Sequence, residues 1–112
     1  MGELYSTGRH LPMDLEKAAG FYQKAAEKGF VVSQLSLGSL YLEGKGVAKD
    51  LTLAIEWISK SAEKNYSVAQ MQLGDCYANG LGVPQDLAMA KEWYQKAASA
   101  GFSTAKQRLK DL

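Results

Sequence analysis

Apolar side chains recur at intervals of three and four residues along two stretches, which is the spacing of one face of an α-helix. These stretches carry Leu51, Ala54, Trp57, Ile58 and Ala62, and then Leu87, Ala90, Trp93, Tyr94 and Ala98. Asp50 and Asp86 precede them, where an N-cap accepts hydrogen bonds from the first free amides. Gly29 and Gly101 stand where a residue in the left-handed conformation ends a helix. Asn65 occupies the equivalent position of the second repeat, and asparagine is the usual second choice there.

A shorter helix is predicted before each of these stretches, and each one contains a glycine. A glycine inside a helix costs about 1 kcal/mol relative to alanine. The recurrence of Gly38 and Gly74 therefore predicts that another helix packs closely on them, beneath a large aromatic side chain. A Gly-x-Gly turn follows each short helix, at Gly44 to Gly46 and at Gly80 to Gly82.

The chain repeats itself at an offset of 36 residues. Residues 31–66 align with residues 67–102 without a gap, and 15 of the 36 positions are identical. The same 36-residue register extends into residues 2–30 and into residues 103–112. We therefore predict a single repeat domain over 1–112, with a partial first repeat at 1–30, full repeats at 31–66 and 67–102, and a C-terminal capping helix at 103–112. A motif that recurs once in every unit builds the unit, which weighs against each copy being an active site.

The recurring positions are assigned structural roles. They are Gly38, Tyr41, Gly44, Gly46, Asp50, Trp57, Gly74, Tyr77, Gly80, Gly82, Asp86 and Trp93. The aromatic column Phe21, Trp57 and Trp93 is expected in the core. The lysine column Lys24, Lys60 and Lys96 is expected on the surface, where Glu56 to Lys60 and Glu92 to Lys96 are favourable i,i+4 pairs.

The net charge, the length of the apolar runs and the cysteine count argue against several functions. The net charge of +1 argues against a strongly basic nucleic-acid binder. No apolar run approaches the ~20 residues that span a bilayer, so we expect no membrane insertion. A single cysteine rules out an internal disulfide and a multi-cysteine zinc site, and no metal or cofactor is expected. A lone thiol does not fix the compartment.

Two features resemble catalytic sites without the surroundings that catalysis needs. Gly80 and Gly82 follow a helix, whereas a phosphate-binding loop follows a strand. Cys76 shares an apolar column with Leu4 and Leu40, and the only histidine, His10, lies two repeats away. We therefore expect Cys76 to behave as a small core residue.

The pattern A/S-x-x-x-L-G-x-x-Y-x-x-G-x-G-V-x-x-D-x-x-x-A-x-x-W-x-x-x-A-A-x-x-G resembles the SEL-one-like repeat family, a branch of the tetratricopeptide-like α-solenoids. Its matches in the third repeat include Ala69, Leu73, Gly74, Tyr77, Gly80, Gly82, Val83, Asp86, Ala90, Trp93, Ala97, Ala98 and Gly101. In the first copy His10 and Leu11 replace the second glycine and the valine. The resemblance implies an all-α fold, a right-handed superhelix of helix pairs whose first helices line the concave face. It also implies a non-catalytic adaptor, because the family shares no catalytic residues.

By analogy with related helix-pair repeats, a protein or peptide partner is expected on the concave face. The candidate contacts are Val32, Leu35, Ser39, Leu42, Glu43, Val68, Met71, Asp75, Ala78, Asn79, Thr104, Gln107 and Asp111. Leu35, Leu42 and Met71 would be apolar anchors. The acidic members of the set would favour a peptide with basic residues.

Three alternatives remain at this point. Met1 occupies the column of Leu37 and Leu73, so the first repeat begins midway through a helix and its exposed apolar surface could self-associate. A hydrolase on this scaffold would lack a nucleophilic side chain paired with a general base. A nucleic-acid binder would lack both a basic field and exposed aromatic side chains.

Overall fold

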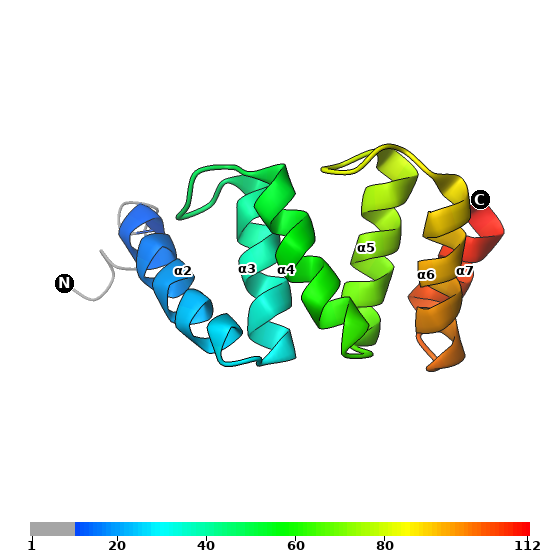
Figure 1. Cartoon of the computed structure of the whole chain (residues 1–112), viewed down its shortest axis with the longest axis horizontal. Helices are drawn as coiled ribbons and strands as arrows, with labels where there is room; N and C mark the ends of the chain where they lie inside the picture. The colour runs from blue at the N-terminus through cyan, green and yellow to red at the C-terminus, as the bar shows by residue number, and fades with distance from the viewer. Residues whose placement is uncertain (1–10) are drawn as a thin grey trace.

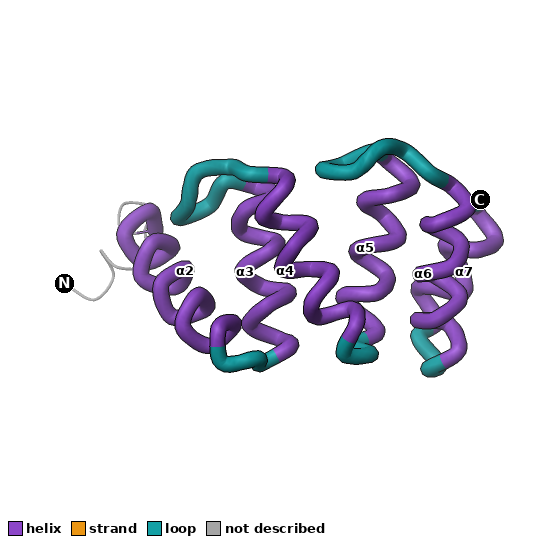
Figure 2. Tube along the Cα trace, viewed as in Figure 1, coloured by secondary structure: helices purple, strands orange, loops and turns teal. Residues whose placement is uncertain are grey.

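The computed structural model describes residues 11–112, which form an elongated stack of helices measuring 49 × 27 × 26 Å (Figure 1). The helices are α2 (Leu11–Glu27), α3 (Val31–Glu43), α4 (Leu51–Glu63), α5 (Ser67–Asn79), α6 (Leu87–Ser99) and α7 (Ser103–Asp111). Every regular element in this part of the chain is a helix, as Figure 2 shows by colour. The all-α prediction is confirmed.

The helices pack as consecutive pairs. The first helix of a repeat lies against the second, which pairs α3 with α4 and α5 with α6. Neighbouring repeats meet where α2 contacts α3, α4 contacts α5 and α6 contacts α7. Because each helix touches mainly its sequence neighbours, the molecule is a solenoid.

Aspartate side chains start the second helices as predicted. Asp50 Oδ1 accepts a hydrogen bond from the amide of Leu53 at 3.0 Å, and Asp86 Oδ1 accepts from Ala88 and Met89 at 3.0 and 3.1 Å. These bonds satisfy amides that the helix itself leaves without partners. Asn65 adopts φ 69°, which confirms its left-handed role after α4.

Helix α2 departs from this pattern at its start. It begins at Leu11, whereas Leu15 is the residue equivalent to Leu51 and Leu87, the first residues of α4 and α6. The first copy lacks the second glycine and the valine of the joint, so one further turn is helical. Met1, His10 and the partial first helix expected in the first repeat lie outside the described residues.

The core lies between the second and third repeats. Leu35, Ile58, Ala62, Ala69, Leu73 and Cys76 form one buried cluster. Partly buried side chains close it from the edges, namely Leu42, Ile55, Tyr66, Val68, Tyr77 and Trp93. Helices α3, α4 and α5 therefore share a single apolar interior, which joins the two repeats rather than enclosing each one separately.

Gly38 and Gly74, inside the first helices α3 and α5, mark close helix contacts, as predicted. A Cβ added to Gly74 would lie 2.7 Å from the ring of Tyr94, and one added to Gly38 would lie 2.6 Å from Cγ1 of Ile58. Both distances are too short for a methyl group. The aromatic residue expected over the glycine is present at Gly74, where it is Tyr94, but Gly38 is covered by the aliphatic Ile58. Both residues are buried, and each follows a tryptophan on its helix.

The prediction that the aromatic column lies in the core is wrong. Trp57 and Trp93 are half-buried, and Phe21 is 72% exposed. The tryptophans lie beside the core positions, one residue earlier on the helix, and therefore form the edge of the packed face. Phe21, in α2 at one end of the described helices (Figure 1), has the least cover of the three.

The predicted lysine to glutamate pairs also do not form. Lys60 Nζ lies 4.7 Å from the ring centroid of Trp57, and Lys96 Nζ lies 4.5 Å from that of Trp93. Within residues 11–112 neither lysine makes an ion pair with its glutamate. The half-exposed indole one turn away attracts the ammonium by its ring quadrupole and covers the lysine stem.

Candidate partner-binding face

The first helices α3, α5 and α7 carry the predicted partner contacts, and we call their shared surface the first-helix face. Successive first helices are joined on it by polar side chains. Ser39 Oγ donates to Gln72 Oε1 at 3.2 Å, which links α3 to α5. One repeat later, Arg108 Nε donates to Asp75 Oδ1 at 2.9 Å, which links α5 to α7. Because both links join the same two repeat columns, they form a ladder along the face.

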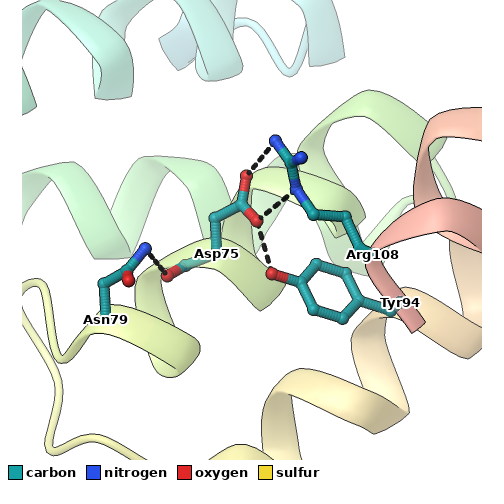
Figure 3. A network of polar contacts seen from close by, with 4 residues as sticks. All are labelled: Asp75, Asn79, Tyr94 and Arg108. Atoms are coloured by element: carbon teal, nitrogen blue, oxygen red, sulfur yellow. Dashed lines mark hydrogen bonds and ion pairs between the residues drawn. The ribbon is translucent and has the colours of Figure 1, made fainter. Parts of the chain in front are cut away.

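Asp75 is the most connected residue of this ladder (Figure 3). Its Oδ1 accepts from both the hydroxyl of Tyr94 in α6 and Arg108 Nε, while Arg108 Nη2 approaches Oδ2 at 3.4 Å. Asn79 Nδ2 donates to the backbone carbonyl of Asp75 at 3.0 Å. The carboxylate thus joins three helices.

The electrostatics of the network follow from these contacts. The hydrogen bond to Asp75, together with its negative charge, raises the pKa of Arg108. Burial raises the pKa of Tyr94, and its hydrogen bond to Asp75 raises it further, so the phenol remains a donor. Asp75 is therefore partnered by a cation of its own chain, which changes the acidic character expected for this face.

The other two predicted acids are also engaged, although both are exposed. Glu43 Oε1 lies 3.4 Å from Lys45 Nζ, and Asp111 Oδ1 accepts from Gln107 Nε2 at 3.1 Å. Both contacts lie at the surface, where such pairs contribute little to stability. Glu43 and Asp111 remain accessible to a basic group of a partner, unlike Asp75.

The apolar candidates differ in what they offer a partner. Leu35 is only 8% exposed and belongs to the core cluster, so it is a packing residue. Leu42 and Val68 are half-buried against that cluster, and Val32 is 55% exposed. Of the remaining candidates Ser39, Met71, Asp75 and Ala78 are half-buried, and Asn79, Thr104, Gln107 and Asp111 are exposed.

Sequence reasoning missed the partners of the ladder. Gln72 and Arg108 were not singled out, although they share one repeat column, and Tyr94 was named only for its apolar spacing. A search for polar residues in columns that face each other from neighbouring repeats would have paired them. The difference of 33 residues between Ser39 and Gln72, repeated for Asp75 and Arg108, is the signal.

A second missed column consists of buried glutamines. Gln34 Nε2 donates to the carbonyl of Ala26, and Gln70 Nε2 donates to that of Ala62, each at 3.2 Å. Both side chains tie a first helix to the end of the preceding second helix. Their identity across the 36-residue offset was visible in the sequence.

Two shallow hollows lie one repeat apart, near the ends of the second helices. One of about 420 Å³ includes Gln34 and Lys60, and the other, of about 430 Å³, includes the equivalent Gln70 and Lys96. Because the two hollows recur with the repeat, they follow from how helix pairs stack.

Cys76 is a core residue, as predicted. Burial, with a smaller contribution from the charge of Asp75, raises the pKa of its thiol to about 11. The thiol therefore stays protonated at neutral pH, and the thiolate is the nucleophilic form. Among the described residues no three His, Cys, Asp or Glu side chains gather in a way that would hold a metal ion. No helix of this part of the chain is long and apolar enough to cross a bilayer.

The stacked helix pairs and their repeated glycines define a helical-repeat solenoid. The family model described as Sel1 repeat matches residues 1–30, 31–66 and 67–102. The chain belongs to the Sel1 repeat family. Members of this family generally act as scaffolds for protein interactions and are typically non-catalytic. No curated protein matches the chain.

Solved structures with the same architecture support this assignment. A Sel1 repeat protein from Oxalobacter formigenes is 45% identical with a TM-score of 0.78, over 81% of this chain and 68% of that one. The protein c5321, a protective antigen present in uropathogenic Escherichia coli strains, displays an SLR fold and is 39% identical with a TM-score of 0.84. That match covers 96% of this chain and 23% of c5321.

Proposed function

We propose that the chain binds a protein or peptide partner on the first-helix face and performs no catalysis. The carrying observation is that this face holds exposed columns in which the repeats differ and that polar contacts link its successive helices. One such column reads Glu43 and Asn79, whereas the glycines and aspartates that build the fold recur. A solenoid keeps its architecture constant and varies its binding surface, so the variable columns are where recognition is expected.

The polar ladder supports this proposal by holding the face in one arrangement. Asp75 is fixed from two sides by Tyr94 and Arg108, and Ser39 is fixed by Gln72. A surface whose side chains are already ordered loses less conformational entropy when a partner binds. Shape, rather than a mobile loop, would then select the partner.

The partner chemistry follows from what the face leaves available. Met71 is half-buried and adaptable, so it offers an apolar contact to a small aliphatic or aromatic side chain. Asn79 on α5 and Gln107 on α7 are exposed amides of the same face, and the exposed Glu43 on α3 and Asp111 on α7 add negative charge. We propose a partner segment with a central apolar residue and flanking polar or basic residues.

Affinity capture from a lysate of the source organism tests the proposal. The baits are the wild type, Met71→Glu on α5 and Met89→Glu on α6. Both methionines are half-buried, so Met89→Glu controls for the added charge and for partial unfolding. Circular dichroism first establishes that all three baits are equally helical. Leu35→Glu is unsuitable because Leu35 lies in the core cluster.

Two results are informative. A protein retained by the wild type and by Met89→Glu, but lost by Met71→Glu, supports the first-helix face. A protein retained by Met71→Glu and lost by Met89→Glu contradicts it and moves the contact to the second helices.

A further inference from the structure

Among the described residues, each contact of the polar ladder leaves one nitrogen donor unused. Gln72 accepts the hydroxyl of Ser39 on Oε1, and its Nε2 donates to no atom of residues 11–112. Arg108 uses Nε and Nη2 for Asp75, and its Nη1 makes no hydrogen bond within the same residues. Figure 3 shows this third nitrogen on the side of the guanidinium that faces away from the carboxylate. Both side chains are only half-buried, so a partner can reach the two donors.

The two donors recur with the repeat. Gln72 on α5 and Arg108 on α7 share one column, and Ser36 fills it on α3. Helices that are bridged by a pair of side chains lie on the order of 10 Å apart, a distance that an extended chain covers in about three residues. An extended segment that runs along the stack therefore meets one donor for about every three of its residues.

The charges beside Arg108 favour a neutral acceptor. The hydrogen bond and the charge of Asp75 raise the pKa of Arg108, and the charge of Asp111 raises it further, so two carboxylates already lie near the guanidinium. A partner carboxylate would add a third negative charge to this group. The neutral acceptors that every peptide offers at regular intervals are its backbone carbonyls. A helix uses these carbonyls for its own hydrogen bonds, whereas an extended chain leaves them free.

We propose that the partner binds the first-helix face as an extended peptide whose backbone carbonyls accept hydrogen bonds from Gln72 and Arg108. This inference rests on the proposed function and adds the conformation of the partner and the atoms that are recognised. The ladder holds the backbone of the peptide, while its side chains contact residues that differ between the repeats, such as Met71. Main-chain hydrogen bonds then supply affinity, and the side-chain contacts supply specificity.

A phage-displayed library of short, random linear peptides tests the proposal without a known partner. Peptides selected on the wild type are measured against Gln72→Glu and Gln95→Glu, once circular dichroism shows that both variants are as helical as the wild type. Gln72→Glu keeps an oxygen that accepts from Ser39 but removes the N–H donor, so binding should fall by at least about tenfold. Gln95→Glu makes the same chemical change on the exposed surface of α6 and should leave binding unchanged.

Ester replacements in a selected peptide then locate the carbonyls. Changing one backbone amide to an ester weakens the preceding carbonyl as an acceptor and leaves every side chain in place. We expect two sensitive positions, about three residues apart. The loss at one position should disappear in Gln72→Glu, and the loss at the other in Arg108→Lys, which keeps a cation for Asp75 but lacks the outer guanidinium nitrogen.

The proposal is overturned if the library yields no peptide that binds the wild type, or if the selected peptides bind Gln72→Glu as tightly as the wild type. Ester replacements whose cost is the same in the wild type and in both variants also overturn it. Binding that is lost in Met71→Glu but kept in Gln72→Glu removes the backbone contact and leaves the first-helix face in place. Binding that survives both Met71→Glu and Gln72→Glu contradicts the proposed function as well.

Discussion

Tyr94 packs its ring on Gly74 and donates its hydroxyl to the next residue, Asp75. One side chain of α6 thereby fixes both the distance between α5 and α6 and the orientation of a carboxylate. That carboxylate holds Arg108 of α7. A packing contact in the core is thus linked to the polar surface that we propose as the binding face.

Tyr94→Phe should lower the free energy of unfolding by about 1 to 2 kcal/mol. The ring volume is kept, but a charged acceptor loses a donor. Urea denaturation measures the change. In an Arg108→Ala background the same substitution should have a different effect, because the two donors share one carboxylate. Strict additivity of the two changes would show that they act separately.

Gly74→Ala and Gly20→Ala should shift stability in opposite directions, although the chemical change is the same. Alanine is preferred to glycine in a helix by about 1 kcal/mol. At Gly20 nothing opposes this gain. At Gly74 the new methyl group meets the Tyr94 ring, and overpacking of this kind costs about 1 to 3 kcal/mol. Equal effects at the two sites, measured by thermal unfolding, would contradict the close approach of α6.

Stability should fall as the pH rises above about 9. Burial raises the pKa of the Cys76 thiol from 9.0 to about 11, so the folded state holds its proton more tightly than the unfolded chain. This contribution is complete below the unfolded pKa and is lost as the pH approaches 11. Two pKa units correspond to about 2 to 3 kcal/mol.

Cys76→Ala isolates this contribution. The variant is less stable at neutral pH because it leaves a small cavity, but its stability should decline less between pH ~8 and pH ~11. The remaining decline should include Tyr94, whose pKa is also raised. Parallel pH profiles for the variant and the wild type would rule out the buried thiol as a source.

Lys96→Met should lower stability by about 0.5 kcal/mol, whereas Glu92→Gln should have almost no effect. The ammonium of Lys96 lies over Trp93 and is not paired with Glu92. An exposed cation–π contact contributes about 0.5 to 1 kcal/mol, and methionine keeps part of the packing. The reverse ranking of the two variants in urea denaturation would favour the ion pair expected from the i,i+4 spacing.

The fold could be predicted because its determinants are local. Asp50 and Asp86 cap helices through bonds that span two or three residues, and Asn65 adopts a local left-handed conformation. Gly38 and Gly74 indicated close packing, because glycine recurs there although a helix interior disfavours it. Such signals need no knowledge of where the partner helix lies.

The identity of the core aromatic residue could not be predicted in the same way. Trp93 and Tyr94 are adjacent, and both are apolar enough to be buried. Which one enters the core depends on the rotation of α6 about its axis, which Gly74 and the tertiary packing set. The repeat column assigned Trp93 to the core, whereas Tyr94 is the buried residue.

The candidate face was predicted only in part. Asp75 was identified by its column, but its partners Tyr94 and Arg108 lie 19 and 33 residues away. Leu35 was assigned to the binding face by analogy with related helix-pair repeats, yet it is buried in the core. Variability between repeats indicates a free surface only where the stacking of neighbouring repeats leaves that surface uncovered.

The most direct test of the proposed function is the affinity of the captured partner for three forms of the protein, measured by titration calorimetry. Met71→Glu should weaken binding by about tenfold or more, or about 1.4 kcal/mol. Met89→Glu should leave binding unchanged. Equal affinity of Met71→Glu and the wild type would contradict recognition by the first-helix face.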